Sequence, residues 1–431
     1  MLRQVDIGSL TGEERRALQF RALAGIRDVE GDVRRILDDV RQRKDAAVRA
    51  LTKQFDKVEL DQIRVPAESI QGAEREVDGV VAKALREAAD HIRRFQEILL
   101  PKSMEASVVP GRPTWRVGQS ALPLGSAGAY VPGGRAAYPS SVLMTCIPAK
   151  VARVKRVALC TPPGADGTVP AVVRYAAKLA EVDEVYAVGG AQAIGAMAFG
   201  TESIAPVEKI VGPGNVWVTA AKKIVSETVA IDFLAGPSEV LVISDGRSGA
   251  DLAACELIAQ AEHDPAAVCV VVTTSPEWVR DVNAELESQL ADLPRKAIAE
   301  EALRRNGRAF VASSGQEAID FVNAFAPEHL MVLGADPRNL LERFTTAGCV
   351  FLGDYTSVTM GDYCAGTNHV IPSGGESRRF RSLSSSDFVR LVPYVSVSDR
   401  GARTLAPIVA DIARAEGLEG HARAAERRMR M

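Results

Sequence analysis

From about residue 115 onward, short apolar runs alternate with runs that have the spacing of amphipathic helices. VKRVALCTPP (154–163) is typical of a buried strand, VVRYAAKLAE (172–181) of a helix and EVYAVGG (184–190) of the next strand. Two strands joined through a helix in this way lie parallel in one sheet, with a right-handed crossover. This alternation therefore restricts the fold class to α/β.

The alternation returns in the second half of the chain. EVLVISD (239–245) has the composition of a strand, and it is followed by a helical run (251–263) and by the strand-like AVCVVVTTS (267–275). Further helical and strand-like runs continue to residue 333. The recurrence of this pattern predicts two tandem Rossmann-like domains with parallel sheets. The two halves share no close sequence repeat, so any duplication is structural.

The segments on either side of the α/β pattern are predominantly helical. Residues 11–25, 30–55 and 79–99 carry apolar residues at helical spacing, and Pro101 ends the last of these runs. The C-terminal stretch TLAPIVADIARAEGL is amphipathic, and such a tail either packs on a partner subunit or covers its own chain. The patterns predict four parts: a mainly helical N-terminal region (1–114), a first α/β domain (115–235), a second α/β domain (236–378) and a helical C-terminal tail (379–431).

Charge and composition exclude several functional classes. The formal net charge of −3 argues against a general nucleic-acid-binding protein, which carries a basic excess. The longest apolar stretch, residues 185–200, is too short to span a membrane and is interrupted by glycines. MLRQVDIGSL lacks the features of a secretory signal, and the six cysteines include no CxxC pair. We therefore expect a cytoplasmic protein with free thiols.

Three glycine-rich turns lie in the first α/β domain, at 130–134, 188–196 and 211–215. The second turn, VGGAQAIGA, follows a strand and opens a helix, where backbone N–H groups and the helix dipole can bind a pyrophosphate. Its glycine spacing is not that of the GxGxxG fingerprint, so tight packing of helix on strand explains it equally well. The chain has no P-loop lysine, which excludes phosphoryl transfer from ATP by that motif.

Four of the five histidines stand in polar or turn-rich motifs. In AEHDP, Gln260 and His263 are three residues apart, so a helix would place both on one face, where they could bind one ligand or cap a solvated helix end. In APEHL, Glu328 precedes His329. Neighbours on an extended stretch point apart, so this pair could serve two steps of one reaction, or it could belong to a structural loop.

A glycine-flanked loop, GDYCAGTNHV (361–370), gathers further polar side chains. Asp362 is either a turn former or a metal ligand that, with Gln260, His263 and one more histidine, would complete a nitrogen and oxygen set suited to zinc. His421 in GLEGH is the histidine left to close that set. His91, among charged neighbours in DHIRRFQEI, is interpreted as a surface residue without a role.

These motifs resemble, in order along the chain, those of the histidinol dehydrogenase family. The resemblance starts at about residue 30, is strongest from 120 to 375, and is carried by VGGAQAIGAMAFGTESIAPVEKIVGPGNVWVTAAKK, IDFLAGPSEVLV, AEHDP, APEHL, GDYCAGTNHVIPSGG and AEGLEGH. It implies a zinc-dependent, homodimeric, cytoplasmic enzyme that oxidises L-histidinol through L-histidinal to L-histidine and reduces two NAD molecules. It also implies that the first α/β domain binds NAD and that the second carries the zinc and the catalytic residues.

The resemblance further implies a role for individual residues. The acid/base pair would be Glu328 and His329. The zinc ligands, which also contact the substrate, would be Gln260, His263, Asp362 and His421. Further substrate contacts would be Ser238, His329, His369 and Glu416. The NAD contacts would be Tyr130, Gln192 and Asn215. Because the C-terminal tail of family members reaches across the dimer, His421 and Glu416 are expected to complete the partner's site.

Three alternatives stay open. An enzyme of the same fold could oxidise another small polar alcohol, such as dihydroxypropanesulfonate, but the carboxylate of Glu416 favours a cationic substrate over an anionic one. A catalytically silent metal- or nucleotide-binding protein would not need the Glu328–His329 pair. Finally, Cys364 could form a thiohemiacetal during aldehyde oxidation, but we favour the interpretation that it is an ordinary small side chain in a loop.

Overall fold

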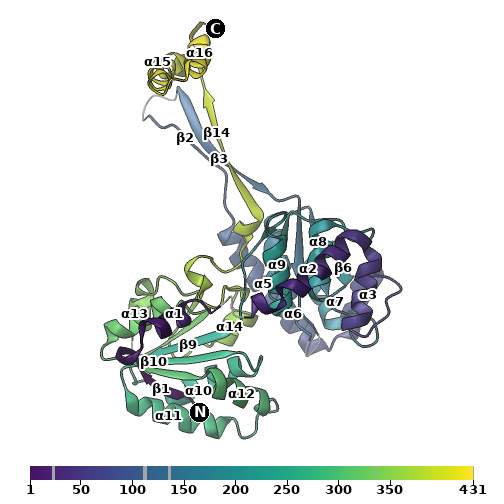
Figure 1. Cartoon of the computed structure of the whole chain (residues 1–431), viewed down its shortest axis with the longest axis vertical. Helices are drawn as coiled ribbons and strands as arrows, with labels where there is room; N and C mark the ends of the chain where they lie inside the picture. The colour runs from purple at the N-terminus through teal and green to yellow at the C-terminus, as the bar shows by residue number, and fades with distance from the viewer. Residues whose placement is uncertain (22–24, 110–113, 134–136, 335, 431) are drawn as a thin grey trace. The chain divides into compact units, whose positions relative to one another are not determined.

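A computed structural model describes the whole chain apart from residues 22–24, 110–113, 134–136, 335 and 431 (Figure 1). The chain divides into two compact units. The first comprises Met1–Leu99 and Gly125–Phe388, and the second comprises Leu100–Leu124 and Val389–Met431. Among the described residues, no helix is long and apolar enough to cross a membrane.

The first parallel sheet has the strand order β6-β5-β4-β7-β8. The chain runs outward from β4 through β5 to β6, and then returns to the other side of β4 for β7 and β8. This Rossmann-like order creates a switch point between β4 and β7, at which the carboxyl ends of the strands leave a crevice. The strands are β4 (Ser126–Tyr130), β5 (Arg156–Thr161), β6 (Glu184–Ala187), β7 (Lys209–Val211) and β8 (Ala230–Ile231).

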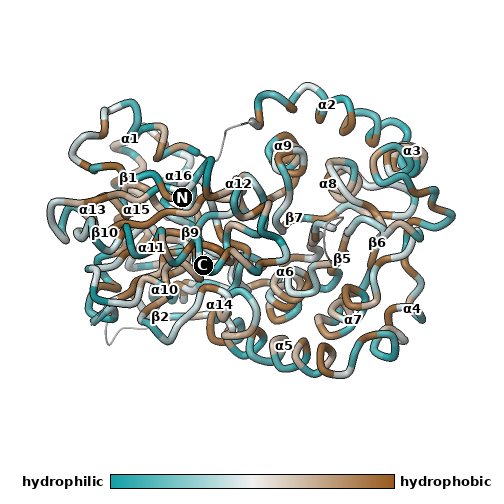
Figure 2. The backbone as a smooth tube through the Cα atoms, turned by 90° about the horizontal axis from the view of Figure 1, so that it is seen from below, coloured by the Kyte–Doolittle hydropathy of each residue, from teal (hydrophilic) through white to brown (hydrophobic). Residues whose placement is uncertain are grey.

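Helices cover this sheet from both the α/β domain and the N-terminal region. The connecting helices are α6 (Pro139–Val151), α7 (Ala171–Leu179), α8 (Gly190–Phe199) and α9 (Val216–Val225). The N-terminal helices are α2 (Ile26–Arg43), α3 (Asp45–Phe55), α4 (Ala67–Gly72) and α5 (Gly79–Leu99). Figure 2 shows α2 and α3 beside α8 and α9, and α5 and α4 beside α6 and α7. The N-terminal helices therefore belong to the body that the first sheet organises.

The second parallel sheet has the strand order β1-β11-β10-β9-β12-β13. Its interior strands are apolar and buried, as expected for a parallel sheet that is covered on both faces. The strands are β1 (Arg3–Asp6), β9 (Glu239–Ser244), β10 (Val268–Thr273), β11 (Arg308–Val311), β12 (His329–Leu333) and β13 (Cys349–Leu352). The helices are α1 (Gly12–Gln19), α10 (Ala250–Ala261), α11 (Pro276–Gln289), α12 (Lys296–Asn306), α13 (Gly315–Phe325) and α14 (Val358–Tyr363).

Two parallel sheets in tandem confirm the predicted α/β fold class. The edge strand β1 was not anticipated, because the sequence indicated only helices in the first hundred residues. Its four residues are too few to show a strand period, and its hydrogen-bond partners come from β11, about 300 positions later in the chain.

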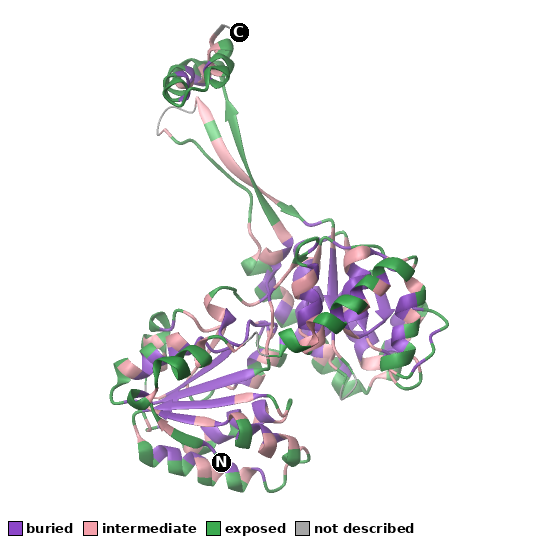
Figure 3. Ribbon diagram, in the orientation of Figure 1, coloured by how far each residue is buried: buried purple, intermediate pink, exposed green. Residues whose placement is uncertain are grey.

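The second unit contains an antiparallel sheet with the order β14-β3-β2 and two helices. These elements are β2 (Met104–Ala106), β3 (Trp115–Pro123), β14 (Val389–Val397), α15 (Asp399–Ala415) and α16 (Glu419–Arg427). The predicted helical tail thus begins with a long strand before its helices. Much of β14 and α15 is exposed (Figure 3). The predicted domain boundaries after residues 114, 235 and 378 stay predictions.

Candidate active site

Glu328 and His329 lie where the chain enters β12. Helix α13 ends at Phe325, Ala326 takes a left-handed conformation, and the chain then turns into the strand. His329 pairs with Val240 of β9 and with Cys349 of β13, so both neighbouring strands hold its backbone. Both side chains are buried, with 7% of Glu328 and 4% of His329 exposed. The pair therefore sits at the amino end of the central strands of the second sheet.

The backbone of Glu239 positions both side chains. Its carbonyl oxygen lies 2.8 Å from Nδ1 of His329 and accepts a hydrogen bond from that nitrogen, while its N–H donates to Oε2 of Glu328 over 2.6 Å. Nδ1 of His329 and Oε2 of Glu328 are 3.7 Å apart, beyond hydrogen-bonding distance. The expectation that the two side chains point apart was therefore wrong: Glu328 precedes the strand, and its longer side chain returns toward the ring.

On its other side, the His329 ring meets Asp362 of α14, with 3.2 Å between Nε2 and Oδ1. Burial by itself lowers the pKa of His329, but the negative charges of Asp362 and Glu328 outweigh burial and raise that pKa to about 10. Burial raises the pKa of Glu328 to about 8, even though the charge of His329 opposes the rise. In this arrangement His329 is an imidazolium that donates from both ring nitrogens.

Helix α14, which carries Asp362, is anchored on α10 by Glu256. Oε2 of Glu256 accepts a hydrogen bond from the backbone N–H of Val358, at the start of α14, over 3.1 Å. Burial raises the pKa of Glu256. The same helix α10 carries Gln260 in its last turn, so Glu256 ties together two of the predicted zinc-binding segments. In the sequence, Glu256 is an acidic residue inside an otherwise apolar helical run. That pattern could have indicated a buried functional residue, but the sequence analysis did not single it out.

Gln260 and His263 lie at the end of α10, as predicted. Gln260 is 4% exposed, and its side-chain amide makes no hydrogen bond to any other residue within the described part of the chain. His263 keeps contact with solvent, but desolvation still lowers its pKa, against the charge of Asp362. Burial raises the pKa of Asp362, whereas the charge of His329 and its hydrogen bond lower it, and the net shift is downward.

His369 and Ser238 border the same region. Nδ1 of His369 lies 2.7 Å from the carbonyl oxygen of Asp362, and Nε2 lies 3.1 Å from Oγ of Ser141, a residue of α6 that sequence reasoning did not single out. Burial lowers the pKa of His369 and favours its neutral form. Ser238 is exposed and immediately precedes Glu239 at the start of β9.

The three residues expected to bind NAD lie at the carboxyl end of the first sheet. Tyr130 ends β4, and its buried hydroxyl accepts a hydrogen bond from the backbone N–H of Gly190 over 3.1 Å. Gln192 is 1% exposed in the first turn of α8. Asn215 caps α9, where its Oδ1 accepts hydrogen bonds from the backbone N–H groups of Trp217 and Val218. All three glycine-rich turns therefore meet at one edge of the sheet.

Glu416 and His421 belong to the second unit. Glu416 follows the last turn of α15, His421 lies in α16, and both are exposed. The first unit thus supplies three of the four predicted zinc ligands. Among the described residues, no group of three or more His, Cys, Asp or Glu side chains is placed so that it could hold a metal ion.

The loop at 361–370 contains Cys364 and is contacted by His91 of α5. Cys364 is exposed. Nδ1 of His91, on α5, lies 2.9 Å from the carbonyl oxygen of Cys364, so His91 is an exposed residue, as expected, but it contacts the loop behind Asp362.

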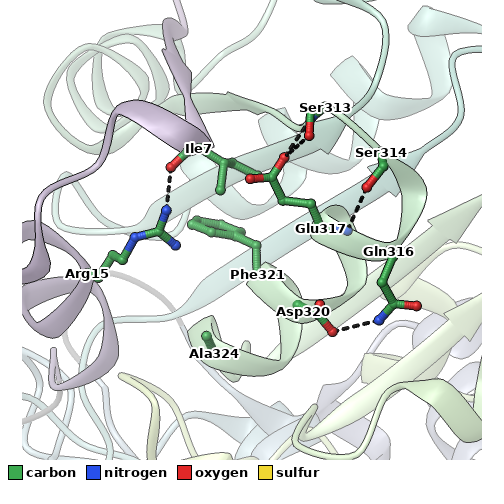
Figure 4. Close-up of a pocket in the computed structure, with 9 residues that line it drawn as sticks. All are labelled: Ile7, Arg15, Ser313, Ser314, Gln316, Glu317, Asp320, Phe321 and Ala324. Atoms are coloured by element: carbon green, nitrogen blue, oxygen red, sulfur yellow. Dashed lines mark hydrogen bonds between the residues drawn. The ribbon is translucent and has the colours of Figure 1, made fainter.

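A pocket of about 530 Å³ lies elsewhere in the first unit, beside the N-terminus of α13 (Figure 4). Its lining contains none of the predicted site residues. Its polar groups already pair with one another: Ser313 donates to Glu317, Ser314 caps the helix, and Gln316 donates to Asp320. Because the predicted site residues lie away from this pocket, the Glu328–His329–Asp362 cluster is the better candidate.

The chain is similar to known proteins along nearly its whole length. A family model described as histidinol dehydrogenase matches residues 20–429. The chain is 44% identical over 410 residues to the histidinol dehydrogenase of Methanothermobacter thermautotrophicus, covering 95% of this chain and 96% of that protein. It is 43% identical over 426 residues to that of Bacillus subtilis, covering 99% of both.

A solved structure shares the fold. The crystal structure of histidinol dehydrogenase from Elizabethkingia anophelis superimposes with a TM-score of 0.93 at 35% identity, covering 100% of this chain and 98% of that one. The resemblance inferred from the motifs is therefore confirmed. The chain belongs to the histidinol dehydrogenase family of NAD-dependent oxidoreductases of histidine biosynthesis.

Proposed function

We propose that the chain oxidises L-histidinol through L-histidinal to L-histidine, with two NAD molecules as acceptors and zinc as the metal. The observation that carries this proposal is the buried cluster in which Asp362 and Glu328 lie 3.2 and 3.7 Å from the two nitrogens of His329. Buried acid/base groups with displaced pKa values in direct contact are characteristic of a catalytic centre that moves protons.

The residues around this cluster fit a zinc ion. Gln260 is 4% exposed and its amide lacks a hydrogen-bond partner among the described residues. His263 favours the neutral form that can coordinate a metal, and Asp362 favours the carboxylate. With His421, they form the nitrogen and oxygen donor set that zinc accepts. Zinc bound there would orient the imidazole and amine of the substrate and would polarise its reacting oxygen.

The carboxyl end of the first sheet fits a dinucleotide. A Cβ atom on Gly189 would lie 2.6 Å from Cβ of Pro162, and one on Gly133 would lie 2.7 Å from Cγ of the same proline. Gly190 adopts a φ of 64°, which favours glycine. The turns thus approach each other closely because they lack side chains, which leaves backbone accessible to a pyrophosphate at the N-terminus of α8.

His329 is the proposed base of the alcohol step. Zinc held by Asp362 would engage the carboxylate that otherwise stabilises the proton on Nε2, and would thereby favour the neutral ring. The neutral ring keeps its Nδ1 hydrogen on the carbonyl oxygen of Glu239, which leaves Nε2 free to accept the hydroxyl proton. A hydride then passes from the alcohol carbon to the first nicotinamide, and the aldehyde forms.

Glu328 is the proposed base of the aldehyde step. It takes a proton from the water that adds to the aldehyde carbon, and the resulting hydrate gives its hydride to the second NAD. Because the pKa of Glu328 is about 8, this carboxyl group can both accept and release a proton near neutral pH. The products are the carboxylate of histidine and two NADH.

We further propose a cytoplasmic homodimer in which each C-terminal tail completes the partner's site. The exposed apolar side chains of the second unit support an interface: they include Val392, Val395, Ile408, Val409 and Ile412. The six cysteines are all free, which fits a reducing compartment. Tail exchange would bring His421 and Glu416 to the Gln260–His263–Asp362 set, and Glu416 would meet the cationic end of histidinol.

The stoichiometry of the reaction tests the proposal. We expect two NADH and one histidine for each L-histidinol consumed by the zinc-loaded protein, and no turnover by the His329→Asn variant. If histidinal accumulates with one NADH, the four-electron mechanism is wrong. If the protein oxidises dihydroxypropanesulfonate but not L-histidinol, the proposed substrate is wrong and the alternative substrate class is correct.

A further inference from the structure

Asp56 lies directly after helix α3, which packs against α8. The segment that follows it runs antiparallel to β6: the N–H of Ala187 donates to the carbonyl oxygen of Ile63, and the N–H of Val65 donates to that of Val185. Residues before Ile63 therefore continue past the carboxyl end of β6, toward Gly190. Figure 1 and Figure 2 both show α3 beside α8.

One oxygen of the Asp56 carboxylate has no hydrogen-bond partner among the residues that the structure describes. Its Oδ2 is buried without a hydrogen bond, and so is Oγ1 of Thr52, one helical turn earlier on the same face. Within the described part of the chain, only one other buried side-chain atom, Nε2 of Gln96, shares this condition. Buried polar groups are normally paired, so an unpaired carboxylate oxygen calls for an external partner.

The position of Asp56 is also unfavourable for a structural role. It is the C-cap of α3, where the helix dipole is negative and a carboxylate is repelled. Burial raises its pKa. Its charge lies close enough to the buried hydroxyl of Tyr130 to add to the rise that burial causes in the pKa of Tyr130. Asp56 therefore lies in the neighbourhood of Tyr130, one of the proposed NAD contacts.

In a Rossmann-like unit, the acid that binds a ribose usually follows the second strand. Here the second strand is β5, and it is followed by Pro162 and Pro163. The next acid, Asp166, accepts hydrogen bonds from N–H and Oγ1 of Thr168, at 2.9 and 2.8 Å. The segment after β5 therefore offers no unpaired acid among its described residues for a ribose. Asp56 is an acid that comes from the N-terminal helical region instead, near Tyr130 at the end of β4.

We propose that Asp56 binds NAD by accepting hydrogen bonds from a ribose diol, and that it selects NAD over NADP. This inference rests on the proposed NAD site and names a further residue of it. A hydroxyl pair would satisfy the buried oxygen, whereas the phosphate on the ribose of NADP would place negative charge against the carboxylate.

Calorimetric titration of the full-length protein with NAD and with NADP tests this role. We expect Asp56→Asn to weaken NAD binding roughly ten-fold or more, because a charge-assisted hydrogen bond is lost. NADP binding should be unchanged or stronger. Asp61→Asn is the matched control, because Asp61 is an exposed acid in the same segment, and it should bind NAD as the unmodified protein does.

Thermal unfolding without cofactor separates binding from structure. Because Oδ2 of Asp56 has no hydrogen-bond partner among the described residues, Asp56→Asn should melt at the same temperature as the unmodified protein or higher. NAD binding by Asp56→Asn within two-fold of the unmodified protein would overturn the inference and leave the proposed function intact. Equal losses for NAD and NADP with a lower melting temperature would also overturn it. Failure of the unmodified protein to bind NAD would instead contradict the proposed function itself.

Discussion

Nε2 of His329 and Oδ1 of Asp362 lie 3.2 Å apart, although the two residues come from different elements of the second sheet's domain. This contact joins the proposed base to a proposed zinc ligand. The same carboxylate can stabilise a proton on His329 or take part in a metal site, so the protonation of His329 and the binding of a cation should compete.

In the protein without added metal, stability should depend on the proton that His329 holds. The pKa of His329 is about 10 in the folded state, above its ordinary value of 6.5. The folded protein thus keeps a proton that the unfolded chain releases, so this contribution is complete below about pH 6.5 and is lost as the pH rises to about 10. We expect the melting temperature to fall across this window, and to fall less in His329→Asn. If the melting temperature falls equally with pH in the unmodified protein and in His329→Asn, this account is wrong.

Glu328→Gln should separate the two oxidations. The amide keeps the shape of the side chain but cannot take the proton of the attacking water, so oxidation of L-histidinal should slow by about 10²- to 10⁴-fold. Oxidation of L-histidinol to the aldehyde should be affected less. Stopped-flow measurement of NADH from each substrate distinguishes the steps, and equal losses in both would show that Glu328 does not act in the second step alone.

Gln260→Ala should weaken zinc binding. The variant removes an amide oxygen from the proposed ligand set and leaves NAD binding unchanged, because the NAD contacts lie on the other sheet. Competition with a coloured zinc chelator gives the metal affinity, and calorimetry gives the NAD affinity. Gln289→Ala, on α11, is the control amide, and an equal effect of both variants on zinc would exclude Gln260 as a ligand.

Cys364→Ser should retain full turnover of L-histidinol and L-histidinal. Cys364 is exposed, and the proposed aldehyde step uses water rather than a thiol. Steady-state rates with each substrate test this expectation. A large loss confined to the aldehyde step would favour the thiohemiacetal route.

Mixed dimers should reveal whether the tails exchange. His329→Asn and His421→Ala subunits are each expected to be inactive as homodimers. In a mixed dimer, exchange would bring the intact His421 of one subunit to the intact His329 site of the other, and activity should return in about a quarter of all sites at random equal mixing. Activity that stays at the level of the parent variants would place each His421 in the site of its own chain.

Local patterns were sufficient to predict several features of this protein. The alternation of apolar and helical runs predicted the two parallel sheets, because burial on both faces demands apolar strands and connecting helices. Gln260 and His263 were placed correctly at a helix end, because their spacing is local. The ordered motifs identified the family, which the comparisons confirm.

Other features depend on contacts between residues that are far apart in the chain. Strand β1 exists because β11 offers it hydrogen bonds, and the Glu239 backbone holds Glu328 and His329 from another strand. Asp56 became notable only once its Oδ2 was found buried without a hydrogen-bond partner among the described residues. Sequence by itself determined the alternating strands and helices of the two parallel sheets and the types of groups available for chemistry. Tertiary structure decided which of these groups come into contact and become buried. It therefore decided which pKa values shift and which buried polar atoms have no hydrogen-bond partner among the described residues.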